Sequence, residues 1–340
     1  MDEKLFQRFN SKGFLSILLV GTVFLCLLTP DVKGQQKIYD DLFSASFPNE
    51  KEGWASGRWG CILHTADGGK TWVRQNTGTN LTLSSVFFVD EKNGWAVGEE
   101  GCIIHTADGG KTWEKQKSPA SLFHMKVYFV GPLKGWIVSE GTHILYTEDG
   151  GKTWTIQFKD QDAILKSVSF CDELNGWAVG EYGYIYHTSN GGKTWEKQAG
   201  WVGISAKTGE VEGGNFLFDV VAIDPETAWA VGIDSYVIRT ENRGKTWKEV
   251  STGARKTALF GIGYDPPTGM ILIGGSGILL TSPDKGQSWK LPECDPPVIY
   301  DWIYGISRRG DSGFLVVGGG GMMYLNEGKN PSTPWKRLKY

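Results

Sequence analysis

Short apolar runs separated by turn residues recur along the chain. The stretch from residue 83 to residue 116 contains four such runs: Leu83 to Val89, Trp95 to Gly98, Cys102 to Thr106 and Thr112 to Gln116. Asn93-Gly94 and Asp108-Gly109 stand between runs, and such dipeptides favour tight turns between antiparallel strands. No window of useful length shows the periodicity of a helix. The pattern therefore predicts four short antiparallel strands in this stretch.

The four-strand unit occurs seven times. Each copy ends on a tryptophan, and these are Trp72, Trp113, Trp154, Trp195, Trp247, Trp289 and Trp335. The spacings are 41, 41, 41, 52, 42 and 46 residues. Four strands in each repeat of about 40 residues are typical of propeller blades. We therefore predict an all-β fold, a seven-bladed β-propeller of four-stranded antiparallel blades. An open solenoid is the alternative, but its end repeats would need polar caps.

Residues 35–340 are predicted to form this propeller as a single domain, and the sequence leaves open how its ring closes. The predicted blades cover about residues 38–79, 80–120, 121–160, 161–200, 215–253, 257–293 and 298–340. The 52-residue spacing predicts an insertion at residues 199–215, between blades four and five. Trp201 in this insertion has no counterpart in the other repeats, which makes it a candidate contact residue. A lid that packs on its own blade is the alternative.

The first 34 residues have the pattern of a secretory signal peptide. Basic residues precede an apolar run of 15 residues from Phe14 to Leu28, and Val32-Lys33-Gly34 resembles a cleavage site. The run is short for a membrane-spanning helix. We therefore predict cleavage near Gly34 and export to the periplasm, a lumen or the extracellular space, with a retained N-terminal anchor as the alternative. The remaining chain has 31 basic and 35 acidic residues, a balance that gives no indication of nucleic-acid binding.

The turn before each tryptophan contains a recurring motif, D-G-G-K-T-W in its commonest form. A phosphate-binding loop would need a glycine five residues before the Gly of Gly-Lys-Thr, and no copy has one. An Asp or Asn side chain can instead accept backbone N–H bonds within its own turn, and a glycine provides positive φ. We therefore predict a structural role, without metal or cofactor, for Asp67, Asp108, Asp149, Asn190, Asn242 and Asp284.

This motif resembles the Asp-box, or bacterial neuraminidase repeat. Together with the run G-W-A-V-G at Gly94 to Gly98 and Gly176 to Gly180, it makes residues 38–340 similar to the photosystem II stability and assembly factor family. The resemblance implies a non-catalytic exported propeller that holds a newly made membrane-protein subunit during complex assembly. That family is associated with an arginine-rich face, whereas the turns between second and third strands here offer Arg58, with Arg308-Arg309 elsewhere in the sequence.

The turns between second and third strands are expected to share one face with the connections between blades. These turns carry a carboxylate in blades two to five, while blade one carries Arg58 beside Trp59. We predict an acidic arc with an aromatic residue at either end, which would dock a basic or polar peptide; solvated turn residues are the alternative. The candidate contact residues are Arg58, Trp59, Glu99, Glu100, Glu140, Glu181, Tyr182, Trp201 and Asp234. Charge reversal at Glu99, Glu140 and Glu181 is expected to abolish binding with little loss of stability.

Catalysis is the weaker interpretation. A glycosidase needs two carboxylates roughly 5 to 10 Å apart across a sugar, and the sequence shows no apolar pocket that would raise the pKa of one of them. We therefore predict a monomeric, non-catalytic scaffold for a protein partner, either a membrane-complex subunit or a basic peptide segment. Contact with the membrane is expected only through that partner. The alternative is a secreted carbohydrate-binding or glycoside-hydrolysing propeller.

Overall fold

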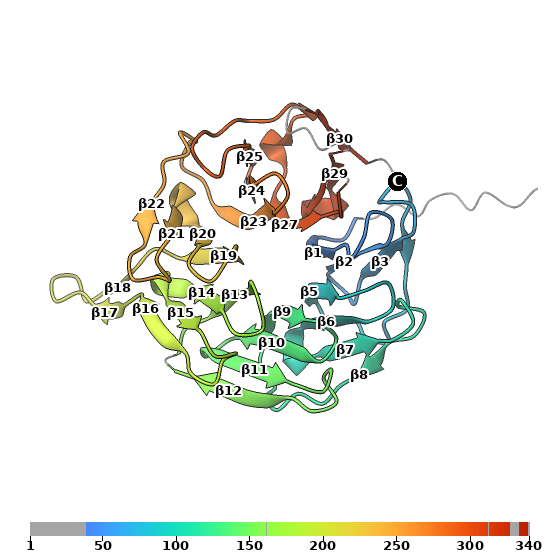
Figure 1. The fold of residues 1–340 in the computed structure, drawn as a ribbon, viewed down its shortest axis with the longest axis horizontal. Coiled ribbons are helices and arrows are strands. Elements are labelled where there is room, and N and C mark those ends of the chain that lie inside the picture. Colours follow the sequence, from blue (N-terminus) through green and yellow to red (C-terminus); the bar gives the residue numbers. More distant parts are fainter. Residues whose placement is uncertain (1–38, 161, 312, 327–332, 339–340) are drawn as a thin grey trace, which may run out of the picture. The chain divides into compact units, whose positions relative to one another are not determined.

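Seven small sheets, antiparallel except for one pair of strands in the seventh, stand around a ring in the computed structural model (Figure 1). The structure describes residues 39–160, 162–311, 313–326 and 333–338, all within the compact unit Gln35–Tyr340. The arrangement confirms the predicted seven-bladed β-propeller. The predicted signal peptide lies outside the described residues. Within those residues, no helix has the length and apolar character to cross a membrane.

Blades one to five each contain four strands that follow one another from the centre of the ring to its rim. Blade one contains β1 (Leu42–Ser46), β2 (Gly53–Gly57), β3 (Ile62–Thr65) and β4 (Val73–Arg74). Blade two contains β5 (Leu83–Phe88), β6 (Gly94–Gly98), β7 (Ile103–Thr106) and β8 (Glu114–Lys115). Blade three contains β9 (His124–Val130), β10 (Lys134–Ser139), β11 (His143–Thr147) and β12 (Thr155–Lys159). Blade four contains β13 (Leu165–Phe170), β14 (Gly176–Gly180), β15 (Ile185–Thr188) and β16 (Glu196–Ala199). Blade five contains β19 (Leu217–Ala222), β20 (Ala228–Gly232), β21 (Val237–Thr240) and β22 (Lys248–Glu249).

The outer strands are shorter than predicted. In blade two the expected strand Thr112 to Gln116 is reduced to β8, Glu114–Lys115. The reason is that Thr112 still belongs to the preceding turn, where its backbone N–H and its hydroxyl both donate to Asp108. The turn motif therefore extends through Trp113, and pairing with β7 begins only after it.

Blades six and seven depart from the four-strand pattern. Blade six contains β23 (Leu259–Asp265), β24 (Met270–Gly275) and β25 (Ile278–Ser282), and in these residues its fourth strand is reduced to a bridge between Thr281 and Lys290. Blade seven contains β27 (Ile303–Arg308), β28 (Phe314–Gly318), β29 (Met323–Leu325) and β30 (Trp335–Arg337). The chain leaving blade six adds β26 (Cys294–Asp295) to this sheet, parallel to β30. Blade seven thus has five strands and blade six has three.

The ring closes where blade seven packs against blade one, and no strand is exchanged between the two sheets in the described part of the chain. Leu42 and Trp72 of blade one share a buried cluster with Leu315 and Leu325 of blade seven. The carboxylate of Asp41 accepts a hydrogen bond from the Gly320 backbone N–H, at 2.8 Å. This hydrogen bond is the main reason that the pKa of Asp41 is lowered. Closure therefore depends on side-chain packing and on hydrogen bonds between the two blades, which include one from the Arg309 guanidinium to the Glu50 carbonyl, at 3.4 Å.

The glycines of G-W-A-V-G are required by close approach. A Cβ on Gly98 would lie 1.8 Å from the Thr82 carbonyl oxygen, and one on Gly94 would lie 2.4 Å from the Phe88 ring. Between them, the buried Trp95 stacks on Phe129 of the next blade with ring centroids 3.7 Å apart. The motif therefore brings the second strand close to its neighbours and sets the packing between consecutive blades.

Candidate partner-binding face

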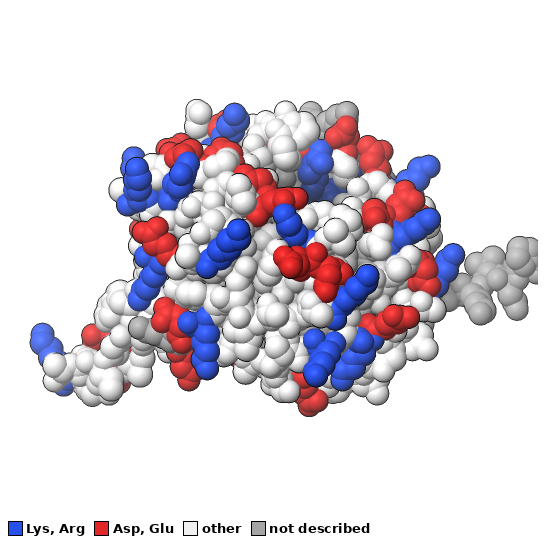
Figure 2. Space-filling model, turned by 60° about the horizontal axis from the view of Figure 1, so that its bottom comes forward, with Lys and Arg blue, Asp and Glu red and all other residues white. Residues whose placement is uncertain are grey.

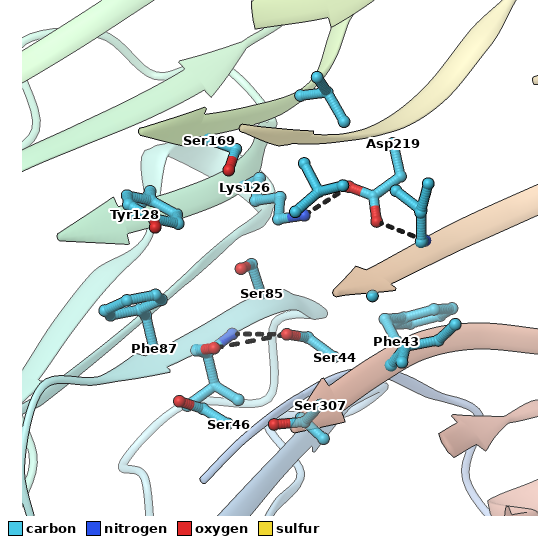
Figure 3. Close-up of a pocket in the computed structure, with 18 of the residues that line it drawn as sticks. Phe43, Ser44, Ser46, Ser85, Phe87, Lys126, Tyr128, Ser169, Asp219 and Ser307 are labelled. Carbon is cyan, nitrogen blue, oxygen red and sulfur yellow. Dashed lines mark hydrogen bonds and ion pairs between the residues drawn. The ribbon is translucent and has the colours of Figure 1, made fainter. Parts of the chain in front are cut away.

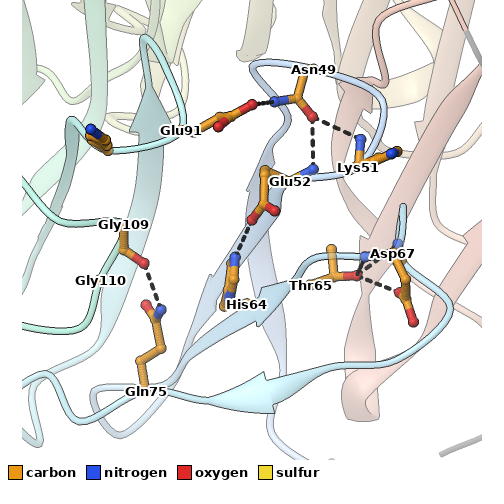
Figure 4. A network of polar contacts seen from close by, with 12 residues as sticks. Asn49, Lys51, Glu52, His64, Thr65, Asp67, Gln75, Glu91, Gly109 and Gly110 are labelled. Carbon is orange, nitrogen blue, oxygen red and sulfur yellow. Dashed lines mark hydrogen bonds and ion pairs between the residues drawn. The ribbon is translucent and has the colours of Figure 1, made fainter.

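The Asp-box turns at one end of the strands are closed by hydrogen bonds within the turn. Asp67 accepts a hydrogen bond from the Thr65 hydroxyl at 2.8 Å (Figure 4) and another from the Thr71 backbone N–H at 2.9 Å. The corresponding bonds to Asp108 lower its pKa to about 2, chiefly through the Thr112 backbone N–H. Asn190 makes the same contacts without a charge. The described residues contain no group of three His, Cys, Asp or Glu side chains arranged to hold a metal ion. Asp67 and Asn190 thus both supply an acceptor oxygen for the same backbone N–H of the turn.

At the other end of the strands, the turns between second and third strands contact the connections between blades. Gly60 N–H donates to the Leu81 carbonyl, Gly101 N–H to that of Leu122 and Thr142 N–H to that of Ala163. We call the surface that they form together the interblade face. It contains the turn residues predicted to contact a partner.

Four of the predicted contact residues occupy one equivalent position. Trp59, Glu100, Tyr182 and Asp234 stand at the centre of their turns, each with φ of 56°. The left-handed conformation is uncommon for residues with a side chain. The conformation of the turn therefore places one residue from each of these four blades at the same position on the interblade face. Trp59 at this position is 65% exposed.

Three predicted carboxylates are held in place by the backbone. Glu99, Glu140 and Glu181 accept hydrogen bonds from the N–H groups of Thr82, Phe123 and Ile164 at 2.8, 3.1 and 3.2 Å. Each bond ties a turn to the connection that enters the same blade. Charge reversal would leave a partly buried N–H without its acceptor, which is costly. The expectation of little loss of stability from such substitutions therefore needs correction, because the sequence did not reveal these bonds.

An aromatic arc lies at the innermost strands of blades five, six, seven and one, and the sequence analysis missed it. Its members are Phe43, Phe218, Phe260, Trp302 and Tyr304. Phe260 contacts Phe218, Trp302 and Tyr304 at centroid distances of 5.3, 6.0 and 5.4 Å, and Tyr304 contacts Phe43 at 5.5 Å. Arg58, which pairs with Asp41 at 2.8 Å, lies over the Phe43 ring. The available signal was the aromatic residue that follows the first, buried residue of β1, β19, β23 and β27.

The arc borders a central cavity of about 670 Å³ that the innermost strands line (Figure 3). Inside it, the Lys126 ammonium contacts the Asp219 carboxylate at 2.5 Å and the Ser167 hydroxyl at 3.1 Å. The other oxygen of Asp219 accepts the Ile262 backbone N–H at 3.0 Å. This network joins blades three to six, so its groups have partners within the ring. We call the opening of this cavity on the interblade face the channel mouth.

The exposed aromatic side chains gather on the interblade face. Among the described residues, five are more than half exposed: Tyr39, Trp59, Trp201, Tyr300 and Trp302. Trp59 belongs to a turn between second and third strands, and the other four belong to the segment entering blade one or to connections between blades. Exposed aromatic residues concentrated on one surface indicate an interaction site.

The predicted insertion forms a hairpin of β17 (Val202–Ile204) and β18 (Val211–Gly213). The hairpin projects from the ring (Figure 1), and Figure 2 shows its surface to be mostly uncharged, while both signs of charge are interspersed elsewhere in that view. At its base, the Trp201 backbone N–H donates to the Tyr182 carbonyl at 3.2 Å. Trp201 is 55% exposed. Its ring lies near Gly203 of the hairpin itself, so one side of the ring is covered by its own segment.

Comparison with protein families gives a match to the model described as photosynthesis system II assembly factor YCF48. The matched segments, residues 75–161, 119–208 and 156–256, together cover more than half of the chain. The chain belongs to this family. Its repeats are thus YCF48-type repeats, in agreement with the resemblance seen in the sequence. No curated protein matches the chain.

Solved structures share the fold of this YCF48-family chain. "YCF48 bound to D1 peptide" has 20% identity and a TM-score of 0.68, covering 85% of this chain and 92% of that one. YCF48 from Cyanidioschyzon merolae has 21% identity and a TM-score of 0.67, covering 85% and 96%. The GH74 xyloglucanase from Xanthomonas campestris has 12% identity and a TM-score of 0.68, covering 89% of this chain and 55% of that one. At these identities the likeness shows the fold alone.

Proposed function

We propose that this protein is an exported, non-catalytic scaffold that binds a segment of a membrane or envelope protein while a complex is assembled. The observation that carries the proposal is that the five aromatic side chains more than half exposed in the described part of the chain all lie on the interblade face. Tryptophan and tyrosine are enriched among the residues that dominate protein interfaces. Membership of the YCF48 family supports an assembly role. The D1 peptide bound to a YCF48 of the same fold supports a peptide segment as the ligand.

Capture from native envelope membranes tests this proposal. The mature chain is immobilised, and cross-linked partners are identified by mass spectrometry for the wild type, Trp59→Ala and Trp201→Ala. Ile156→Ala is the matched control, because Ile156 is also exposed but lies on β12, at the rim of blade three. We expect a membrane-complex subunit that the wild type and the control retain and the two tryptophan variants lose. Equal recovery by all four proteins, or no enriched protein, would contradict the proposal.

Export is the second part of the proposal, and it rests on the signal pattern of residues 1–34. Cell fractionation with N-terminal sequencing of the mature protein tests it. A mature N-terminus near Gln35 in an exported fraction is expected. An intact N-terminus in the soluble cytoplasmic fraction would contradict it.

The carbohydrate alternative rests on the GH74 likeness and on the same aromatic side chains, which can stack on sugars. Glu99, Glu140 and Glu181 each use one oxygen to hold a backbone N–H. A glycan array with a hydrolysis assay separates the two functions. Binding or cleavage of a polysaccharide, without capture of any protein, would favour the alternative.

A further inference from the structure

The channel mouth is chemically divided. One side, formed by blades five, six, seven and one, carries the aromatic arc of Phe43, Phe218, Phe260, Trp302 and Tyr304. On the side of blades two, three and four, the cavity is lined at the equivalent strand positions by Ser84, Met125 and Lys166. Glu99, Glu140 and Glu181 stand next to this lining, in turns that are hydrogen-bonded to the residues just before these strands. A partner that lies across the mouth and reaches these turns meets an apolar surface on one side and carboxylates on the other, with Lys166 beside Glu181.

The carboxylates are fixed before a partner arrives. In each, Oε2 accepts a backbone N–H, which leaves Oε1 for another ligand. In the described residues, Glu181 has a cation nearby, the Lys166 ammonium at 3.7 Å, whereas Glu99 and Glu140 take part in no ion pair. Groups held in one position lose little conformational entropy when they bind. Glu99 and Glu140 are therefore prepared to receive a cation.

The aromatic side carries two ion pairs close to the rings and, in the described residues, one arginine outside any ion pair, Arg255, which donates to the Gly277 carbonyl at 3.4 Å. Arg58 pairs with Asp41 at 2.8 Å, and Arg337 reaches Asp301 at 3.4 Å. The ring of Trp302 is half exposed, whereas the other four arc members are partly covered by one another and by the strands. Trp302 therefore offers the accessible surface on which an apolar side chain can pack.

Resting on the proposed function, we propose that the channel mouth binds a linear peptide segment with two parts. Its apolar or aromatic residues pack on Trp302 and the arc, and its Lys or Arg residues reach Glu99 and Glu140. The charge complementarity fixes the direction in which the segment lies, and the arc contributes most of the buried apolar area.

Three short fluorescein-labelled peptides of equal length test this assignment by fluorescence anisotropy. One joins a Leu/Trp part to an Arg part, the second has Glu in place of Arg, and the third has Gly/Ser in place of Leu/Trp. We expect the first peptide to bind at least about tenfold more tightly than the other two. Preferential binding of the Glu peptide would overturn the assignment, since it would show that exposed cations such as Arg255 and Lys256 determine recognition.

Two variants locate the segment on the mouth. Trp302→Ala is expected to weaken binding of the Leu/Trp–Arg peptide about tenfold with an unchanged salt dependence. The double variant Glu99→Gln with Glu140→Gln keeps an acceptor for each backbone N–H but removes the charge. It is expected to weaken binding several-fold at low salt and to flatten the salt dependence. Ile156→Ala and Glu114→Gln, at exposed positions on the outer strands β12 and β8, are the matched controls.

Unchanged affinity in both mouth variants, with their melting temperatures preserved, would overturn the assignment. The membrane capture experiment distinguishes that result from failure of the scaffold function. If the wild type still retains a membrane subunit that Trp59→Ala or Trp201→Ala loses, the scaffold stands and the divided mouth is rejected. If no protein is captured and no peptide binds, both are rejected.

Discussion

Gln75 of blade one donates a hydrogen bond from Nε2 to the carbonyl oxygen of Gly109 in the Asp-box turn of blade two, at 2.9 Å (Figure 4). Its Oε1 accepts the indole N–H of Trp113 from the same blade, at 3.3 Å. The glutamine thus clamps the next blade by two bonds. Equivalent clamps recur at the following three junctions, through Gln116, Gln157 and Gln198.

Loss of a glutamine clamp is expected to destabilise the ring. Gln116→Leu removes the bonds to the Gly150 carbonyl and the Trp154 indole. The Trp154 N–H loses its acceptor, whereas the Gly150 carbonyl keeps the hydrogen bond from the Trp95 indole, at 3.1 Å. We expect a decrease in the free energy of unfolding of about 1–3 kcal/mol, measured by urea denaturation. Lys115→Leu introduces the same side chain at an exposed neighbouring position and is the control. Equal stability of the two variants would show that the clamp contributes nothing.

The Asp-box turns are expected to tolerate an amide but not a methyl group. Asp67→Asn keeps the acceptor oxygen for Thr71, as Asn190 does for Thr194 in blade four. Asp67→Ala removes it, and by analogy with helix caps the expected loss is about 1 kcal/mol. Thermal melts at neutral pH compare the two. A loss of stability in the Asn variant as large as that in the Ala variant would mean that the charge, rather than the acceptor oxygen, stabilises the turn.

Gly98→Ala is expected to destabilise the blade strongly, because its Cβ would lie 1.8 Å from the Thr82 carbonyl oxygen. The connection would have to move, at a cost of about 1–3 kcal/mol typical of overpacking. Gly319→Ala is the control, since its Cβ would meet nothing nearer than 3.8 Å and its φ is not positive. The melting temperatures of the two variants decide the point. A Gly98→Ala protein as stable as the control would contradict the close-approach explanation.

Mild acid is expected to destabilise the propeller through His124. Burial lowers its pKa to about 4, and its ring nitrogens contact the hydroxyls of Ser139 and Ser118. In the unfolded chain the pKa of this histidine has its ordinary value near 6.5. The unfolded chain therefore binds the proton before the folded protein does as the pH falls. Stability is therefore full above about pH 6.5 and declines towards pH 4, by up to about 3 kcal/mol.

His124→Asn isolates this contribution. His105 and His187, whose pKa values burial also lowers, remain in the variant, so the difference in pH dependence belongs to His124. Urea denaturation at several pH values should show a flatter profile for the variant between pH 6.5 and 4. Profiles of equal slope would mean that His124 is not buried in its neutral form.

Much of the fold could be predicted from the sequence, because its signals are local and repeated. The tryptophan spacing gave the number of blades, and the turn motif around Asp67 indicated its own hydrogen bonds. The fourth strand of blade six could not be predicted. There the chain pairs with the outermost strand of blade seven, where Cys294 lies opposite Trp335. Whether a segment pairs with its own blade or with the next one depends on both partners, so the sequence of the segment alone does not predict it.

The candidate site could be predicted only in part. The sequence by itself determined which residues stand in the turns, such as Trp59 and Glu99, because the repeat fixes their place in each blade. Only the tertiary structure decided that Phe260 and Trp302, 42 residues apart, join one aromatic arc, and that Glu99 holds the Thr82 N–H. The physical reason is that closing the ring brings together side chains from different blades. Their distances and exposure depend on packing between blades, whereas the sequence pattern records only the position within each blade.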